Sequence, residues 1–213
     1  MPGAWRPASD TPTVTLLLRH GQTPYSTDRR FAGTGDIGLT EAGVVQAAAA
    51  AERLGKLGTV DAIVTSPLRR ARLTAAAVED SCGTPLAVED GFAETDFGDW
   101  EGLTFAEASA RDAAGVEAWL ASPEVAPPGG ESFTAVQARV LDGLSRVLET
   151  YRGKTVVIVS HVTPIKILLA HALEAPLSSL HRMFLDTACL SRVDWYPDGP
   201  AVVRSLNDTA HLS

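Results

Sequence analysis

Short runs of apolar residues recur along the chain, and three of them stop abruptly at polar residues. These runs lie at residues 14–18, 61–65 and 155–159. An apolar run of this length without alternation is typical of a strand that is buried on both faces of a parallel sheet. Two further strands are expected at residues 191–195 and 201–206, on either side of a turn that contains proline, aspartate and glycine.

Segments with helical features separate these strands. Thr40 can cap a helix that runs from Glu41 to about Leu57 and is rich in alanine. Pro164 is expected in the first position of another helix, where its missing N–H does no harm. Two more helices are expected, at residues 68 to about 79 and 132 to about 151. Strands that alternate with helices predict an α/β fold with a mostly parallel sheet.

Two parts of the chain depart from this rhythm. Residues 1–12 contain prolines among scattered polar residues, which is typical of a tail or an extended linker. Residues 13–213 are expected to form one domain, in which residues from about 97 to 131 make a small cap inserted over the sheet. Four aromatic residues in or beside this cap are expected mainly in the core, with one or two at the entrance of a site: Trp100, Phe105, Trp119 and Phe133.

The composition of the 213 residues is ordinary for a soluble globular protein, with 45% hydrophobic and 21% charged residues. Acidic residues outnumber basic ones 26 to 18, so a surface that binds nucleic acid is not expected. No apolar run approaches the roughly 20 residues needed to cross a bilayer, and no signal peptide is recognisable. Cys82 and Cys189 are far apart, which favours two unpaired thiols. We therefore expect a cytoplasmic protein without a membrane partner.

Each of the three abrupt strand ends carries residues suited to bind an anion. The first strand is followed by Arg19-His20-Gly21, the second by residues 66–70 with two arginines, and the third by Ser160-His161. Because ligands bind at the carboxyl ends of strands in open α/β sheets, we expect these groups to converge. Neutral imidazole is a good nucleophile, and the arginine fork matches phosphate oxygens. The pattern predicts a site for phosphoryl transfer.

A phosphoryl transfer from an ester also needs a proton for the leaving alkoxide. Glu94 is the best candidate for this role, in the segment ETDFGDWEG at residues 94–102. Asp96, Asp99 and Glu101 lie close by in the sequence and are alternatives. His171, His181 and His211 have no comparable motif around them and are expected to be structural or exposed.

Several of these motifs together resemble those of the histidine phosphatase superfamily, also called phosphoglycerate-mutase-like. The resemblance extends from about Thr13 to Asn207. It rests on these segments: LLLRHGQT with its RHG motif at 16–23, TSPLRRARLTA at 65–75, ETDFGDWEG at 94–102, GGES at 129–132 and VSH at 159–161. It implies a three-layer α/β/α sandwich with a mostly parallel central sheet.

The resemblance also implies roles for individual residues. His20 is the residue that becomes phosphorylated, and Glu94 is the acid and base. Arg19, Arg70 and His161 bind and stabilise the phosphoryl group, while Arg69 is exposed. Thr23, Ser26 and Val162 are further expected to contact the substrate. Ser26 stands where many relatives have asparagine, and Val162 stands where glycine usually follows the second histidine.

These expectations amount to a metal-independent phosphomonoesterase of acid phosphatase type, which acts on small phosphorylated substrates and needs no cofactor. The segment SHVTPIK at residues 160–166 resembles the phosphatase half of actinobacterial bifunctional ribonuclease H/acid phosphatase proteins. A ribonuclease H domain upstream in a longer parent chain is therefore considered. Two alternatives stay open: a phosphoglycerate-type mutase and a module that binds phosphorylated ligands without turnover.

Overall fold

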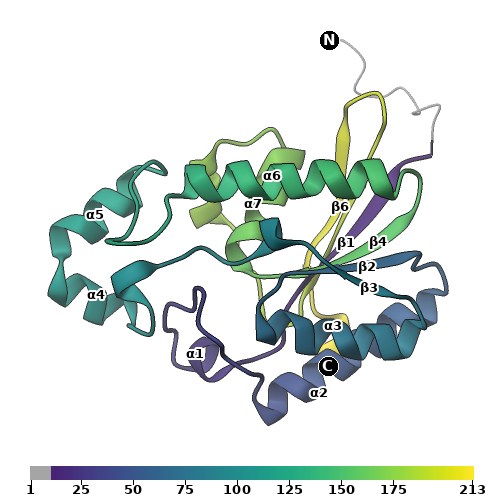
Figure 1. The fold of residues 1–213 in the computed structure, drawn as a ribbon, viewed down its shortest axis with the longest axis horizontal. Coiled ribbons are helices and arrows are strands. Elements are labelled where there is room, and N and C mark those ends of the chain that lie inside the picture. Colours follow the sequence, from purple (N-terminus) through teal and green to yellow (C-terminus); the bar gives the residue numbers. More distant parts are fainter. Residues whose placement is uncertain (1–10) are drawn as a thin grey trace.

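A six-stranded sheet forms the centre of the computed structural model, which describes residues 11–213 (Figure 1). The strands lie in the order β3-β2-β4-β1-β5-β6. β1 to β4 are parallel, whereas β5 is antiparallel to both of its neighbours. Their bounds are β1 Thr13–Arg19, β2 Ala62–Thr65, β3 Leu86–Val88, β4 Thr155–Ser160, β5 Leu190–Trp195 and β6 Ala201–Asp208. The predicted α/β fold is confirmed; β3 is a strand that the sequence analysis did not predict.

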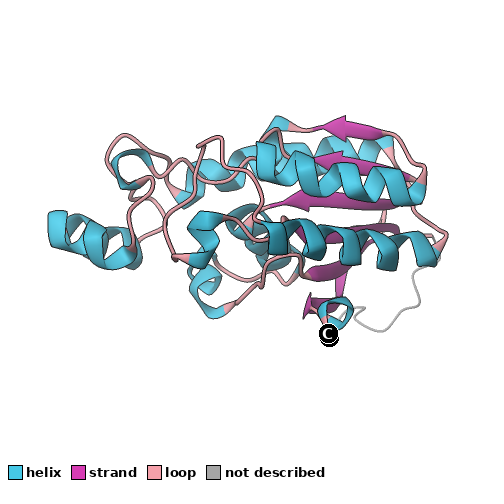
Figure 2. Cartoon of the chain, turned by 90° about the horizontal axis from the view of Figure 1, so that it is seen from below, coloured by secondary structure: helices cyan, strands magenta, loops and turns pink. Residues whose placement is uncertain are grey.

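Helices cover both faces of this sheet, which confirms the three-layer sandwich (Figures 1 and 2). Leu16 and Leu18 of β1 pack with α2 and α3, whereas Leu17 points to the opposite face and packs with α6 and α7. This alternation follows from the two-residue period of a strand. The helices are α1 Pro24–Thr27, α2 Glu41–Leu57, α3 Arg69–Cys82, α4 Phe105–Arg111, α5 Ala113–Ala121, α6 Phe133–Thr150 and α7 Val162–Ala172.

The helix starts follow their capping residues. The Thr40 side chain accepts a hydrogen bond from the Gly43 N–H at 3.0 Å, so α2 begins where the sequence predicted it. α7 begins earlier than expected, because His161 is its N-cap and Val162 its first residue. Pro164 therefore occupies the third helical position rather than the first. It is tolerated there because the first N–H groups of a helix have no partner within the helix.

One aromatic residue of the proposed cap does not lie where it was expected. α4 and α5 lie at one end of the molecule, beyond the end of α6 (Figure 1). Trp100, Trp119 and Phe133 are buried, but Phe105 is 47% exposed because it begins α4 on the outside of this thin insertion. The prediction that Phe105 belongs to the core was wrong.

Two glycines let the loop after β1 contact the first turn of α2. A Cβ atom on Gly21 would lie 2.3 Å from the Gly43 carbonyl oxygen, and one on Gly43 would lie 2.1 Å from the Gln22 carbonyl oxygen. Neither position therefore has room for a side chain. The contact fixes the backbone immediately after His20.

Other expectations concern residues away from the site. Cys82 and Cys189 are both unpaired, as predicted. None of the helices in residues 11–213 is long and apolar enough to span a membrane. Residues 1–10 lie outside the described part of the chain, so the tail or linker at 1–12 stays a prediction.

Candidate active site

His20 follows the last residue of β1 and is almost completely buried, with 4% of its surface exposed. Its Nδ1 donates a hydrogen bond to the Gly21 carbonyl oxygen at 2.7 Å. In the neutral ring this bond places the hydrogen on Nδ1 and leaves the lone pair on Nε2. Burial and the positive charges of Arg19 and Arg70 hold the pKa of His20 well below its usual value of 6.5. The ring is therefore neutral near pH 7, with an unprotonated Nε2.

His161, at the end of β4, lies beside His20. The centroids of the two rings are 5.2 Å apart. The His161 Nε2 and the Ser66 hydroxyl form a hydrogen bond of 2.7 Å, while Nδ1 is buried and has no partner among residues 11–213. If Ser66 donates, Nδ1 carries the hydrogen and can donate it to a ligand oxygen. Burial, together with Arg70, lowers the pKa of His161 well below 6.5.

Arg19 and Arg70 bring two guanidinium groups to these histidines. The Nη1 of Arg19 donates to the Leu185 carbonyl oxygen at 2.5 Å, and its Nε has no partner among the described residues. Arg70 is completely buried, and its Nη2 donates to the carbonyl oxygens of Ala32 at 2.9 Å and Gly33 at 2.7 Å. Arg70 therefore also holds the loop between α1 and α2 in place.

The arginine that precedes Arg70 lies outside the site. Arg69 is exposed and forms a long ion pair with Asp36, at 3.6 Å. The expectation that the second arginine of the pair is the inward one is confirmed.

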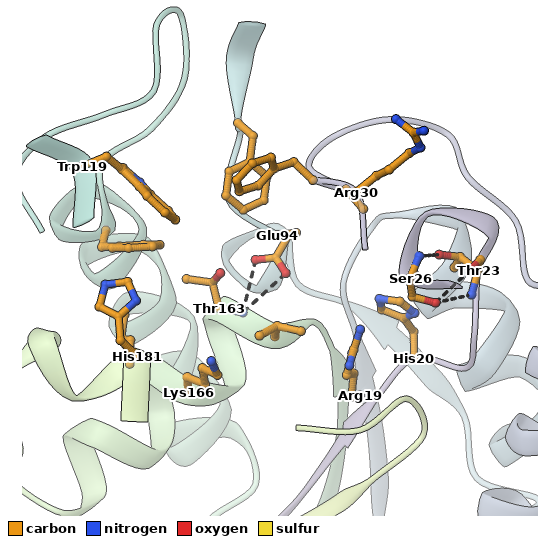
Figure 3. A pocket seen from close by; sticks show the side chains of 16 residues that line it. Arg19, His20, Thr23, Ser26, Arg30, Glu94, Trp119, Thr163, Lys166 and His181 are labelled. Atoms are coloured by element: carbon orange, nitrogen blue, oxygen red, sulfur yellow. Dashed lines mark hydrogen bonds between the residues drawn. The ribbon is translucent and has the colours of Figure 1, made fainter. Parts of the chain in front are cut away.

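Glu94 is buried at the start of α7, with 5% of its surface exposed (Figure 3). Its carboxylate accepts a hydrogen bond from the Thr95 N–H at 2.9 Å. The Thr163 N–H, in the first turn of α7, approaches both carboxylate oxygens at 3.3 and 3.4 Å. A helix N-terminus favours negative charge, so this is a suitable place for a carboxylate.

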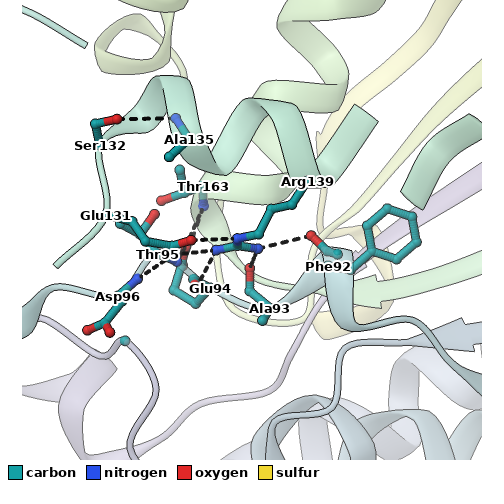
Figure 4. Close-up of polar contacts among 12 residues, drawn as sticks. Phe92, Ala93, Glu94, Thr95, Asp96, Glu131, Ser132, Ala135, Arg139 and Thr163 are labelled. Atoms are coloured by element: carbon teal, nitrogen blue, oxygen red, sulfur yellow. Dashed lines mark hydrogen bonds and ion pairs between the residues drawn. The ribbon is translucent and has the colours of Figure 1, made fainter. Parts of the chain in front are cut away.

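Arg139 of α6 anchors the loop that carries Glu94 (Figure 4). Its guanidinium donates to the carbonyl oxygens of Glu94 at 2.9 Å, Ala93 at 2.7 Å and Gly91 at 3.0 Å. It also pairs with both carboxylate oxygens of Glu131, at 2.9 and 2.8 Å. The sequence analysis missed Arg139, because an arginine inside an amphipathic helix gives no signal of the loop that it contacts.

Thr23 and Ser26 cap α1 with their own side chains. The Thr23 hydroxyl accepts from the Ser26 N–H at 3.1 Å. The Ser26 hydroxyl accepts from the Thr23 N–H at 2.8 Å and donates to the Thr23 carbonyl oxygen at 2.9 Å. The hydroxyl hydrogen of Ser26 is thus already engaged, whereas that of Thr23 can be donated to a ligand.

A cavity of about 240 Å³ opens above these groups (Figure 3). It is lined by six of the predicted site residues: Arg19, His20, Thr23, Ser26, Glu94 and Val162. The other two, Arg70 and His161, are fully buried next to His20 and are not part of the lining. Among residues 11–213 there is no cluster of three His, Cys, Asp or Glu side chains that could hold a metal ion.

Four polar residues in the lining were not predicted: Arg30, Thr163, Lys166 and His181. His181 was expected to be structural or exposed; it is exposed, but it also packs against Trp119 and Phe133 at the cavity. Thr163 and Lys166 are three residues apart on α7, so helical periodicity from the His161 motif could have indicated both. No motif could have indicated His181, because its place depends on how the cap packs.

The arrangement of these residues agrees with a comparison of the sequence with models of known protein families. Residues 15–209 match the family model of the histidine phosphatase superfamily, branch 1. The chain belongs to the histidine phosphatase superfamily. Several of the relatives and solved structures that it is similar to are named phosphatases.

Three of these similar proteins show how far the likeness extends. A bifunctional protein of Mycobacterium tuberculosis is 49% identical over 208 residues, which are 98% of this chain and 57% of that protein. Phosphoserine phosphatase 1 of Hydrogenobacter thermophilus is 31% identical over 92% of this chain and 93% of its own. The structure of mycobacterial glucosyl-3-phosphoglycerate phosphatase with VO3 has a TM-score of 0.84 and 32% identity, and it covers 92% of this histidine phosphatase and 100% of that chain. The chain thus spans little more than half the length of the bifunctional relative.

Proposed function

We propose that this histidine phosphatase hydrolyses small phosphate monoesters through a phosphohistidine formed on the Nε2 of His20. The observation that carries the proposal is the hydrogen bond from Nδ1 to the Gly21 carbonyl, because it leaves Nε2 as the nucleophilic atom. The lowered pKa of His20 supports the same role, because it keeps that atom unprotonated. The cavity in front of the ring is large enough for a small ester.

The reaction has two steps. In the first, the lone pair of Nε2 attacks phosphorus, the bond from phosphorus to the alcohol oxygen breaks, and protonated Glu94 gives its proton to that oxygen. In the second, the Glu94 carboxylate takes a proton from water, the water oxygen attacks phosphorus, and the bond to Nε2 breaks. Inorganic phosphate leaves, and His20 and Glu94 return to their starting states.

The charge that the phosphoryl oxygens carry in both steps is stabilised by fixed donors. We assign this role to Arg19, Arg70 and the Nδ1 of His161, with help from the hydroxyl of Thr23 and the backbone at Val162. Most of the catalysis of phosphoryl transfer is positioning and electrostatic stabilisation, which guanidinium groups supply. The proposed reaction needs no metal ion or organic cofactor, since every acid, base and donor is a side chain or a backbone N–H group.

Two wider proposals concern the whole protein. We propose that the phosphatase acts in the cytoplasm, which two unpaired cysteines favour. We also propose that in a longer parent chain it follows a ribonuclease H domain. The partial coverage of the bifunctional relative supports a further domain in such a chain.

The test is phosphate release from p-nitrophenyl phosphate in EDTA, from acidic to neutral pH, by the protein and its His20→Ala variant. We expect release by the unchanged protein and a loss of at least a thousandfold in His20→Ala. His171→Ala is the matched control, because His171 stacks on Trp195 away from the cavity and should keep full activity. Turnover that persists in His20→Ala would contradict the proposal. Conversion of 3-phosphoglycerate to an isomer, without phosphate release, would instead identify a mutase.

A further inference from the structure

Lys166 is a lysine without a direct polar contact in residues 11–213, although the charge of Glu94 acts on it at longer range. The chain has three lysines, and the other two, Lys56 and Lys154, are exposed and pair with Glu52 at 2.6 Å and Asp61 at 3.4 Å. Lys166 is partly buried and makes no hydrogen bond or ion pair within residues 11–213, and burial lowers its pKa. Placing a charge in a poorly solvated position without a partner costs free energy. A bound anion would remove this cost.

The neighbouring charges do not supply that partner. Glu94 is the carboxylate in the cavity lining, but it lies outside ion-pair distance of Lys166 and is held by the N–H groups of Thr95 and Thr163. Arg30, another cation of the lining, is already paired with Glu107 at 2.8 Å. Arg19 lies next to His20, where the phosphate is expected. Lys166 is therefore the cation that remains for another part of the substrate.

The order of the groups along the cavity indicates which part of the substrate lies near Lys166. In the view of Figure 3, Glu94 and Arg19 both lie between His20 and Lys166, and Thr163 and Lys166 line the cavity from α7. If phosphorus is at His20 and the leaving oxygen is at Glu94, the remainder of the alcohol extends toward Lys166. On that side the wall is formed by Trp119, Phe133, Leu180 and His181. Its apolar side chains suit a carbon skeleton, and because burial and the charge of Lys166 lower the pKa of His181, Lys166 is the cation on this wall for a charged substituent.

We propose that Lys166 binds a carboxylate on the alcohol part of the substrate, so that the preferred substrates are phosphorylated hydroxy acids. One cation matches one negative charge, which favours a carboxylate over a second phosphate. This inference rests on the proposed function, because it uses the phosphate position next to His20. It makes Lys166 a specificity-determining residue of the site. It also defines the chemical class of the preferred substrates.

The test compares two ligands that differ by one carboxylate, O-phosphoserine and phosphoethanolamine. Their affinities are measured by titration calorimetry on His20→Ala protein, in which neither ligand is turned over. We expect O-phosphoserine to bind at least tenfold more tightly. Adding Lys166→Gln should reduce this ratio to about twofold or less, whereas adding Lys56→Gln, which removes the same charge from the exposed face of α2, should leave the ratio unchanged.

Two outcomes would overturn the inference: equal affinity for both ligands in the His20→Ala protein, or a ratio that Lys166→Gln leaves intact. Failure of the proposed function would be seen separately, as absence of p-nitrophenyl phosphate hydrolysis by the unchanged protein. A second readout is the ratio of kcat/KM for the two ligands as substrates. In the Lys166→Gln protein, the loss for O-phosphoserine should lie in KM more than in kcat.

Discussion

At the scale of single residues, the site is defined by what its polar atoms already contact. The Nδ1 of His20 and the hydroxyl of Ser26 are engaged with backbone groups, while the Nε of Arg19 and the Nδ1 of His161 have no partner among residues 11–213. Buried polar atoms without partners are rare in folded proteins. Here they surround one histidine, where the phosphoryl group is proposed to bind.

The lowered pKa of His20 leads to a prediction about the acidic side of the pH profile. Since Nε2 attacks only when unprotonated, the fall in kcat/KM that reports protonation of His20 should lie below pH 6.5. The measurement is kcat/KM for p-nitrophenyl phosphate between pH 4 and 8, corrected for ionisation of the substrate. A fall centred at or above pH 6.5 would show that His20 is not the neutral nucleophile described above.

At the scale of elements, α6 and the loop before the cap are joined by Arg139 as well as by the packing of Phe92 against α6. Its five donors hold three carbonyl groups and the Glu131 carboxylate, so the backbone of Glu94 is fixed from a helix far away in the sequence. Arg139 is a positioning residue, because it acts on the proposed acid through the backbone.

Removal of this anchor should affect stability and turnover together. For Arg139→Met we expect a loss of about 2–4 kcal/mol in the free energy of unfolding, because Glu131 and the carbonyl groups lose their partner. We also expect kcat to fall at least tenfold, by more than KM rises, since Glu94 is displaced. Arg146→Met is the control on the same helix. Arg146, which is exposed, pairs with the largely covered Glu89, and its removal should cost about 1–2 kcal/mol, without a change in kcat. Equal kcat values in the two variants would contradict the positioning role.

Most elements could be predicted because their signals are local. α2 lies between Thr40, a capping side chain, and Gly58, which adopts a left-handed conformation with φ +64°. β1, β2 and β4 are apolar runs that end at the site residues. β3 has only three residues, which is too short for a recognisable apolar pattern. The start of α7 is set by the backbone conformation of His161, and sequence patterns locate helix ends only to within one or two residues.

The candidate site also divides into residues with a local sequence signal and residues without one. The residues that follow strands were predictable, because the ends of neighbouring parallel strands meet at one edge of a sheet. The wall of the cavity opposite His20 was not, since Trp119, Lys166 and His181 come from the cap and from helices whose packing sets their position. Sequence therefore indicated the phosphate pocket better than the leaving-group pocket.

At the scale of the whole molecule, the two buried histidines make folding depend on pH. Both have a pKa well below 6.5 in the folded state, so below that pH the unfolded chain binds protons that the folded chain does not. Above pH 6.5 both histidines are neutral in the folded and unfolded states, so they do not change the free energy of unfolding with pH. Below pH 6.5 protonation stabilises the unfolded chain, and the free energy of unfolding falls.

This linkage predicts a measurable loss between pH 7.5 and 5.5. Each histidine should lower the free energy of unfolding by at most about 1.4 kcal/mol over that interval, because one pH unit below the unfolded pKa corresponds to that amount. Urea unfolding at both pH values gives the loss. In His161→Gln the decrease in the free energy of unfolding between pH 7.5 and 5.5 should be smaller by the contribution of His161. The variant should also be less stable than the unchanged protein at both pH values. A pH dependence identical to that of the unchanged protein would show that the pKa of His161 does not differ between the folded and unfolded states.

The contact between Gly21 and Gly43 has a consequence for how substitution data on this protein are interpreted. Because a Cβ at either position would lie within 2.3 Å of a backbone oxygen, almost any replacement at either one should disturb the backbone that holds His20. In a mutational scan these glycines would be as intolerant as residues that bind phosphate, although neither has a side chain to offer. Loss of activity on substitution therefore does not identify a chemical role here, and the two groups of positions are separated by measuring whether the folded protein remains.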